Sequence, residues 1–155
     1  MGCPPTTSRD GGLLDVNPNS VSFNRYILPE NFQGQISAWY FGHATWSYCS
    51  VQFGHLDRMQ KDFDADYPEA GIFILGVNEI GYGGNSSIYE GRDLPWLLDT
   101  YEANWWGQWS VTLRDVVILD RDGDETDVFN LTEHNLDNPD EYEALKTLLL
   151  DSAEN

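Results

Sequence analysis

Three short apolar runs constrain the fold of this chain more than any other feature. They cover residues 36–41 (ISAWYF), 72–78 (IFILGVN) and 115–119 (DVVIL). A strand that is covered on one face alternates apolar and polar residues, whereas a strand covered on both faces is apolar almost throughout. The runs therefore predict the inner strands of a central mixed β-sheet flanked by helices, which is an α/β fold.

Helices are expected after the first run and at the end of the chain. Gly42–Thr45 ends the first run, and the apolar positions that follow are spaced by four, three and seven residues. These are Cys49, Phe53, Leu56 and Phe63, with Met59 alongside. Such spacing places them on one helix face, so the Cys49 side chain is expected to be partly buried. A terminal helix is expected from Asn138-Pro139, with Tyr142, Leu145, Leu148 and Leu149 on its apolar face.

The remaining segments predict smaller elements within one domain. Residues 1–20 are rich in Pro, Gly, Ser, Thr, Asn and Asp and are expected to form a flexible leader, followed by a single domain over residues 21–155. Segment 94–109 predicts an extended piece around Pro95 and then a helical turn. Other expected elements are a strand over 21–28, a Gly-rich connection over 81–91, a hairpin turn over 120–124 and its return strand over 126–131.

The charge balance argues against two classes of partner. The 155 residues include 26 acidic and 8 basic side chains, which gives a net charge of −18. Nucleic acids and anionic membranes bind to clusters of Lys and Arg, so neither partner is expected. No apolar run reaches the ~18 residues that a membrane span requires. The acidity suits either a salt-adapted organism or an extracytoplasmic protein, and the sequence leaves both open.

Neither a metal nor a cofactor is expected from the sequence. Cys3 and Cys49 are too few for a disulfide framework or a zinc site. The Gly-rich connection lacks the spacing that cradles phosphate. A group of four carboxylates suggests a calcium loop: Asp120, Asp122, Asp124 and Asp127. Gly and Glu do not stand at the positions that such a loop requires, so a hairpin turn is expected there. The start of the chain, with Cys3, fits a loose lipidation pattern or an unmodified leader.

The junction between the first apolar run and its helix holds the candidate chemistry. Its sequence is His43-Ala44-Thr45-Trp46-Ser47-Tyr48-Cys49. Unsatisfied N–H groups at a helix N-terminus stabilise an anion such as a thiolate. The segment from Ala44 to Cys49 resembles the selenocysteine-x-x-Cys segment of the selenoprotein P family, whose N-terminal domain is thioredoxin-like. Two further stretches are similar to that domain: Leu94-Pro95, and residues 104–123 with Trp106 and the run from Arg114 to Gly123.

The resemblance covers roughly residues 32–131 and implies a thioredoxin-like redox protein. It implies disulfide exchange or peroxide reduction, with position 46 as the nucleophile seat and Cys49 as the resolving thiol. The implied partners are a thiol, disulfide or peroxide substrate and, as a further option, another protein. The resemblance implies no cofactor, and it favours an extracellular or periplasmic location only weakly.

Trp46 departs from the pattern of that family, because Trp cannot act as the nucleophile in thiol chemistry. One hypothesis is that Trp46 stands for selenocysteine, whose codon UGA some translation schemes render as Trp. The alternative is a true Trp, which makes the chain a redox-inactive binding module. In that alternative other tryptophans could wall a groove, although core packing is the simpler interpretation of Trp96, Trp105, Trp106 and Trp109.

Two residues near this junction, His43 and Arg114, have both a functional and a structural interpretation. His43 could serve as a base or hydrogen-bond donor, or it could be structural. Arg114 falls where most thioredoxins place a cis-proline, and it could hold an acidic substrate or favour an ionised chalcogen. The alternative for Arg114 is an ion pair with Asp115 or Asp120. Ser47 is expected to cap the helix, and His55 is expected to be solvated.

Overall fold

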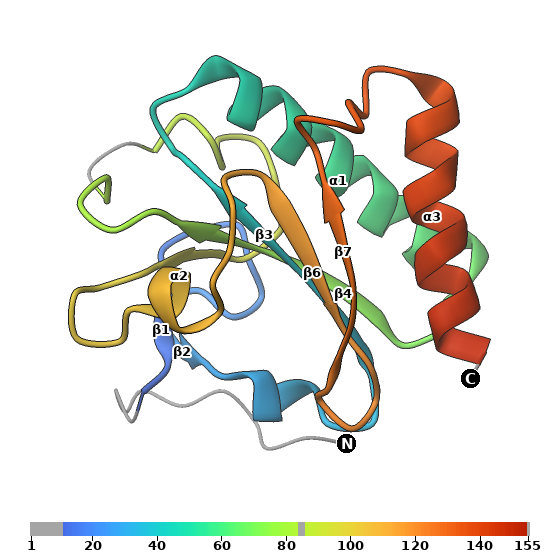
Figure 1. The fold of residues 1–155 in the computed structure, drawn as a ribbon, viewed down its shortest axis with the longest axis horizontal. Coiled ribbons are helices and arrows are strands. Elements are labelled where there is room, and N and C mark those ends of the chain that lie inside the picture. Colours follow the sequence, from blue (N-terminus) through green and yellow to red (C-terminus); the bar gives the residue numbers. More distant parts are fainter. Residues whose placement is uncertain (1–10, 84–85, 155) are drawn as a thin grey trace.

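The structure is a computed structural model that describes residues 11–83 and 86–154. Its centre is a seven-stranded mixed sheet in the order β2-β1-β5-β4-β3-β6-β7 (Figure 1). The strands are β1 (Leu13–Asp15), β2 (Tyr26–Ile27), β3 (Ile36–Gly42), β4 (Ile72–Asn78), β5 (Trp96–Leu98), β6 (Asp115–Leu119) and β7 (Glu125–Asn130). The three apolar runs are β3, β4 and β6, and they occupy the middle of the sheet. The predicted α/β fold with a central mixed sheet is confirmed.

Strand direction changes on both sides of the β3–β4–β5 group. Strand β3 runs parallel to β4, which runs parallel to β5. On one side of this group β1 is antiparallel to β5. On the other side β6 is antiparallel to β3, and β7 is antiparallel to β6. The carboxyl ends of β3 and β4 therefore meet at one edge, where the register pairs Gly42 with Asn78.

Two helices cover one face of the sheet. Helix α1 (Ser47–Asp66) and helix α3 (Pro139–Glu154) lie side by side on that face (Figure 1). Every predicted apolar position of α1, Cys49 included, is buried. Gly76 in β4 leaves room for this layer, because a Cβ at that position would lie 2.3 Å from the Trp96 ring and 2.7 Å from Phe53.

The opposite face is covered by short segments and tryptophans. Helix α2 (Trp105–Gln108) and the 3₁₀ turn η1 (Pro29–Phe32) lie there. The Trp39 ring packs edge-on against Trp105 and Trp109 at 5.6 Å between ring centroids. The buried Asp99 carboxylate accepts hydrogen bonds from the N–H groups of Trp105 and Trp106, which holds α2 in place. The core-packing interpretation of Trp105 and Trp109 agrees with these contacts.

The expected leader over residues 1–20 is wrong for its second half. Strand β1 pairs with both β2 and β5, and Leu13 is 1% exposed. Asn17 lies in a polar network, since its Nδ2 atom donates to the carbonyl oxygens of Arg92 and Leu94. Three of the polar residues in this second half, Asp15, Asn17 and Ser20, are thus buried hydrogen-bonding groups. Residues 1–10, and the lipidation hypothesis for Cys3, lie outside the described residues.

Two smaller expectations also need correction. The strand expected over 21–28 is reduced to β2, because the preceding residues turn and Asn24 adopts a positive φ of 66°. His55 is not simply solvated, because its Nε2 atom lies 2.6 Å from the Asp137 carboxylate. No helix in the described ranges is both long enough and apolar enough to span a membrane.

Candidate functional site

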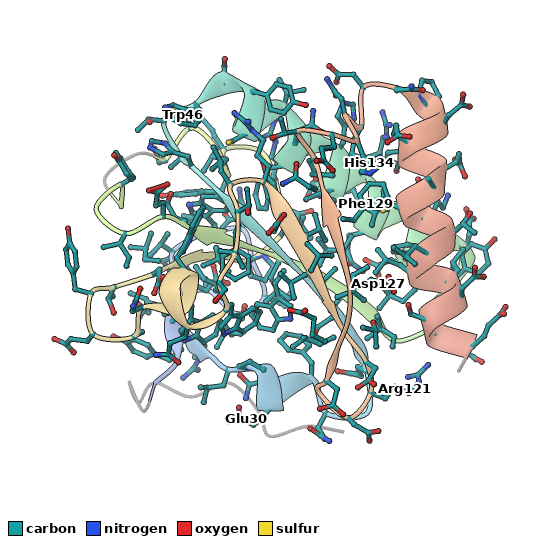
Figure 2. All side chains as sticks on the ribbon, in the orientation of Figure 1. Glu30, Trp46, Arg121, Asp127, Phe129 and His134 are labelled. Carbon is teal, nitrogen blue, oxygen red and sulfur yellow. The ribbon has the colours of Figure 1, made fainter. Side chains whose placement is uncertain are left out.

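The candidate site lies at the carboxyl end of β3, where the chain turns into α1. Trp46 is the N-cap residue, with extended backbone angles of φ −98° and ψ 126°, and its carbonyl accepts the Ser50 N–H at 3.1 Å. Ser47 is already the first helical residue, and no side chain caps the helix, so the expected Ser47 cap is wrong. Figure 2 shows Trp46 at the end of the molecule opposite Glu30 and Arg121.

The two positions of the predicted redox pair differ sharply in accessibility. The Trp46 side chain is 46% exposed, whereas Cys49, one turn further along α1, is 0% exposed. Cys49 is a free thiol. The burial predicted from its helical spacing is confirmed. An attacking group at position 46 would therefore meet a substrate first, while a thiol at position 49 would act only from within the protein.

His43 is packed between two aromatic rings beneath the site. Its ring lies 4.4 Å from the Trp46 ring, nearly parallel at 11°, and 3.8 Å from the Tyr82 ring. The Thr45 N–H donates to His43 Nδ1 at 3.3 Å, and the Thr45 hydroxyl lies 2.7 Å from the same atom. Since a backbone N–H can only donate, Nδ1 is an acceptor and the proton of the neutral ring lies on Nε2. Nε2 can therefore serve the predicted role of hydrogen-bond donor, whereas Nδ1, the basic atom of the neutral ring, already accepts the Thr45 N–H.

Asn78 fixes the turn that carries His43. It ends β4 and is fully buried. Its Oδ1 atom accepts the Ala44 N–H at 3.0 Å, and its Nδ2 atom donates to the Tyr82 carbonyl at 2.7 Å. One side chain thus joins the β3–α1 turn to the loop that supplies Tyr82. Neither Asn78 nor Tyr82 belongs to a recognisable sequence motif, so the sequence did not predict their roles. These roles follow only from the parallel pairing of β3 with β4.

Arg114 reaches the site from the segment before β6. Its backbone has a positive φ of 72°, and its N–H donates to the Phe41 carbonyl at 2.8 Å. The guanidinium carbon lies 4.3 Å from the centre of the Tyr48 ring and 5.6 Å from that of the Trp46 ring. Its Nη1 atom donates to the Thr132 hydroxyl at 3.0 Å. Stacking over two rings places a positive charge beside position 46.

The alternative ion pairs for Arg114 are not formed. The Asp115 carboxylate instead accepts hydrogen bonds from the Thr112 N–H and the Asn130 amide. The Asp120 Oδ1 atom accepts the N–H groups of Asp122 and Asp124, which closes the hairpin turn between β6 and β7. These carboxylates therefore have turn-forming roles, as expected for the hairpin.

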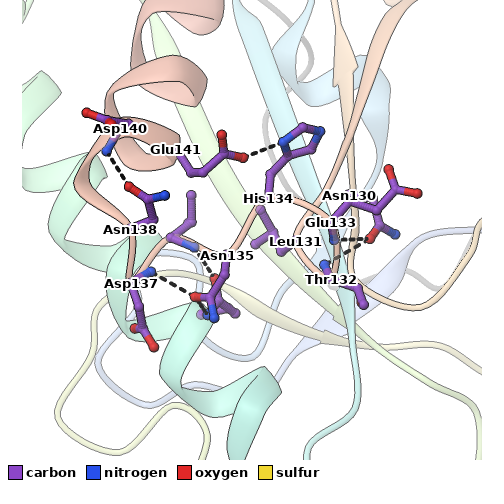
Figure 3. Close-up of polar contacts among 12 residues, drawn as sticks. Asn130, Leu131, Thr132, Glu133, His134, Asn135, Asp137, Asn138, Asp140 and Glu141 are labelled. Atoms are coloured by element: carbon purple, nitrogen blue, oxygen red, sulfur yellow. Dashed lines mark hydrogen bonds and ion pairs between the residues drawn. The ribbon is translucent and has the colours of Figure 1, made fainter.

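The connection between β7 and α3 contacts the site through Tyr48 and Arg114, and Figure 3 shows the hydrogen bonds within this connection. Asn130 Oδ1 accepts the N–H groups of Thr132 and Glu133, and His134 bonds to Glu141 at the start of α3. The Tyr48 hydroxyl donates to the Leu131 carbonyl at 2.7 Å. Burial raises the pKa of the Tyr48 hydroxyl, although the Arg114 charge opposes this shift.

Comparisons with known proteins identify the fold. No family model and no curated protein matches the sequence. Among solved structures, a Bacteroides thetaiotaomicron protein described as a disulfide isomerase aligns at a TM-score of 0.68 and 12% identity, over 100% of this chain and 92% of its own. A Chlorobium tepidum protein described as a thiol:disulfide interchange protein aligns at 0.67 and 14%, over 99% of each chain.

A third solved structure, the exposed lipoprotein thioredoxin of Streptococcus pneumoniae, aligns at a TM-score of 0.57 and 19% identity, over 77% of this chain and 87% of its own. At these identities the likeness concerns the fold, and the predicted resemblance to the selenoprotein P family stays a prediction. The sheet order, the position of α1 after β3 and the three alignments agree that the chain has the thioredoxin-like fold.

Proposed function

We propose that this chain is a thiol or selenol redox protein, with residue 46 as the nucleophile seat and Cys49 as the resolving thiol. The observation that carries the proposal is the arrangement of these two positions. Residue 46 is exposed at the N-terminus of α1, and a buried free thiol lies three residues later. The named functions of the solved structures, disulfide isomerase and thiol:disulfide interchange, support the same chemistry.

The surroundings of position 46 favour an anion. The first N–H groups of α1 have no partner within the helix, and the positive end of the helix dipole lies there. The Arg114 guanidinium lies 5.6 Å from the centre of the Trp46 ring and adds a full positive charge. A chalcogenolate placed in this seat would be stabilised by both groups.

We further propose that the natural residue at position 46 is selenocysteine. A tryptophan there leaves Cys49 without a partner in dithiol chemistry, although the helix N-terminus, the buried thiol and the Arg114 charge are present. The UGA codon of selenocysteine accounts for a Trp at this position. The resemblance of Ala44–Cys49 to the selenocysteine-x-x-Cys segment supports this assignment.

The proposed reaction reduces a disulfide by two electrons. The selenolate at position 46 attacks one sulfur, so that a Se–S bond forms, the S–S bond breaks and a first thiolate leaves. The Cys49 thiolate then attacks the selenium, which forms an internal Se–S bond and releases a second thiolate. Both leaving groups take up protons, and the protein is oxidised. With a peroxide, the selenolate would take one oxygen as a selenenic acid, which Cys49 would resolve with release of water.

A redox-inactive binding module is the second candidate, and one observation favours it. Trp46 forms a stack with the His43 ring and lies beside Arg114, so a true Trp would present an ordered aromatic surface. Tyr82 is 40% exposed on the same cluster. A partner bound there should lose affinity when Trp46 is replaced by Ala.

The experiment that separates the two candidates replaces Trp46 with Cys. We expect Trp46→Cys to form an internal disulfide with Cys49 and to reduce a disulfide substrate with turnover, measured as thiol release with dithiothreitol as electron donor. The matched control, Trp46→Cys combined with Cys49→Ser, should stop at a mixed disulfide. A folded Trp46→Cys protein that neither forms the internal disulfide nor turns over would refute the redox proposal.

The location of the protein is a separate proposal. We propose an extracytoplasmic site of action, supported by the exposed lipoprotein thioredoxin among the structural neighbours and by the acidic surface. Mass analysis of the natural N-terminal peptide would show whether Cys3 carries a lipid.

A further inference from the structure

Tyr40 lies directly beneath the proposed resolving thiol. It belongs to β3, is 0% exposed, and its ring stacks on Phe53 of α1 at 6.2 Å between centroids. Its hydroxyl donates a hydrogen bond to the Cys49 carbonyl oxygen at 3.2 Å. No step of the proposed reaction uses this hydroxyl, although it is a buried polar group next to the residue that resolves the intermediate.

We propose that the Tyr40 hydroxyl is the hydrogen-bond donor that stabilises the Cys49 thiolate while it attacks residue 46. This inference rests on the proposed redox function and adds a residue to its second step. In that step Cys49 first loses its proton to water, its sulfur then forms the bond to residue 46, and the bond from residue 46 to the substrate sulfur breaks as the second thiolate leaves. Tyr40 keeps its own proton throughout and contributes only the hydrogen bond.

A buried thiolate needs such a donor. Cys49 is fully enclosed, and an anion without water or a hydrogen-bond partner is strongly disfavoured. The Cys49 carbonyl is inside α1, where the N–H four residues later is its regular partner. The Tyr40 hydroxyl is thus a second donor on that oxygen. The proposal requires it to turn from this oxygen to the sulfur of the same residue, and the helical bond is kept when it does.

The raised pKa of Tyr40 suits a hydrogen-bond donor and not a base. Burial, and after it the charge of Cys49 and a hydrogen bond with its side chain, raise the pKa of Tyr40 well above its ordinary value. The other charged or titratable groups that act on Tyr40 are Arg114, which lowers the pKa, and Tyr48, which raises it. The phenol therefore stays protonated across the pH range in which thiols ionise.

The test uses the full chain with Trp46→Cys and the chromogenic aryl disulfide dithionitrobenzoate. Attack by the new thiol at position 46 releases one coloured thiolate, and resolution by Cys49 releases the second. We expect Tyr40→Phe in this background to slow the second release about tenfold at neutral pH, which is the low end for a hydrogen bond to a charged group. The midpoint of its rate–pH profile should move upward, and the first release should not change.

Two further variants keep the test decisive. Tyr142→Phe removes another bonded hydroxyl on the α1–α3 side of the molecule and should leave both phases within about twofold, so a general loss of stability cannot imitate the expected result. If Tyr40→Phe does not fold, fluorotyrosine at position 40 replaces it. Its more acidic hydroxyl is a stronger donor and should move the midpoint downward.

The outcomes distinguish this inference from the function on which it rests. An unchanged second phase in Tyr40→Phe, or an unmoved midpoint with fluorotyrosine, overturns the role of Tyr40 and leaves the redox proposal intact. Absence of the first release, or of any second release, in Trp46→Cys alone overturns the redox proposal itself.

Discussion

At the scale of single residues, the site depends on how differently the fold treats positions 46 and 49. Trp46 is nearly half exposed, and Cys49 is enclosed. The spacing of Cys49 with Phe53 and Leu56 was enough to predict its burial, because a helix repeats its faces every three to four residues. The contact between Tyr40 and Cys49 could not be predicted, since a tyrosine inside an apolar run has the same pattern as any core residue.

Residue-level prediction also failed for two polar side chains. His55 lies off the apolar face of α1, which favours solvation, yet α3 and the segment before it bring Asp137 to within 2.6 Å. Ser47 has the chemistry of a cap but stands one position too late. Both errors have the same origin, because the partner or the boundary is set by tertiary packing and not by the local sequence.

The Tyr142–Asp62 pair predicts a pH dependence of stability. The Tyr142 hydroxyl donates to Asp62 at 2.6 Å, and this bond, followed by the Lys146 charge, lowers the pKa of Asp62. A lowered folded pKa gives stability that is present above the unfolded value, about 3.9, and is lost as the pH falls through the folded value. On the alkaline side, burial and then Asp62 raise the pKa of Tyr142 to about 12, so stability is lost as the pH rises from about 10 to about 12.

Tyr142→Phe should therefore lower the free energy of unfolding by about 1 kcal/mol at pH 7, a modest value because the Asp62 side chain is 35% exposed. Urea unfolding at several pH values measures this difference. The difference should shrink below about pH 4 and above about pH 10. A loss that is equal at all pH values would show that packing, and not this hydrogen bond, is responsible.

At the scale of elements, continuous apolar runs predicted the inner strands, and period-3.6 spacing predicted α1 and α3. Strand β1 was missed because it has only three residues within a stretch of turn-forming composition. Its partners explain why it forms. The buried Asp15 carboxylate accepts N–H groups from Asn17 and Trp96, and the sequence separation of Trp96 hides this link from local patterns. Short strands held by side-chain hydrogen bonds leave no periodic signal.

Arg121 lies in the turn between β6 and β7, at the end of the molecule opposite the site, and joins this turn to three other segments. Its guanidinium donates to the carbonyl oxygens of Gly34, Ala70 and Ala153, which lie before β3, before β4 and in the last turn of α3. Arg121→Met should lower the free energy of unfolding by about 2 kcal/mol, because three carbonyls lose a charged donor at once. Equilibrium unfolding followed by circular dichroism measures this loss.

Lys61 provides the matched comparison for Arg121. It is an exposed cation on α1 that pairs with the buried Asp57 carboxylate at 2.7 Å. Asp57 keeps another donor, the Asp93 N–H at 2.9 Å, and an ion pair with one partner in solvent contributes little. Lys61→Met should cost less than about 1 kcal/mol, and added salt should weaken the ion pair that it removes. Equal losses in the two variants would contradict the assigned role of Arg121.

At the scale of the whole molecule, the net charge of −18 dominates. Mutual repulsion among the carboxylates opposes the compact state, and salt screens it. Raising sodium chloride from about 0.01 M to about 0.5 M should increase stability by about 1 kcal/mol, or the melting temperature by about 3 °C. A melting temperature that falls with salt would mean that attractive ion pairs outweigh the repulsion.

The same charge bears on the choice of substrate. Arg114 is a cation beside the site of an otherwise acidic chain, so long-range forces repel anionic proteins while the site itself favours an anion at short range. Neutral or cationic disulfide substrates should therefore meet the nucleophile seat more readily than acidic ones. Nothing in the fold alone specifies this preference, because thioredoxin-like scaffolds support several chemistries.

The identity of residue 46 in natively produced protein tests the central claim most directly. Mass spectrometry of the peptide that contains Ala44–Cys49 measures it, together with the codon in the natural gene. We expect a selenocysteine mass with the selenium isotope pattern and a TGA codon. A tryptophan mass with a TGG codon would contradict it and would leave a thioredoxin-like binding module.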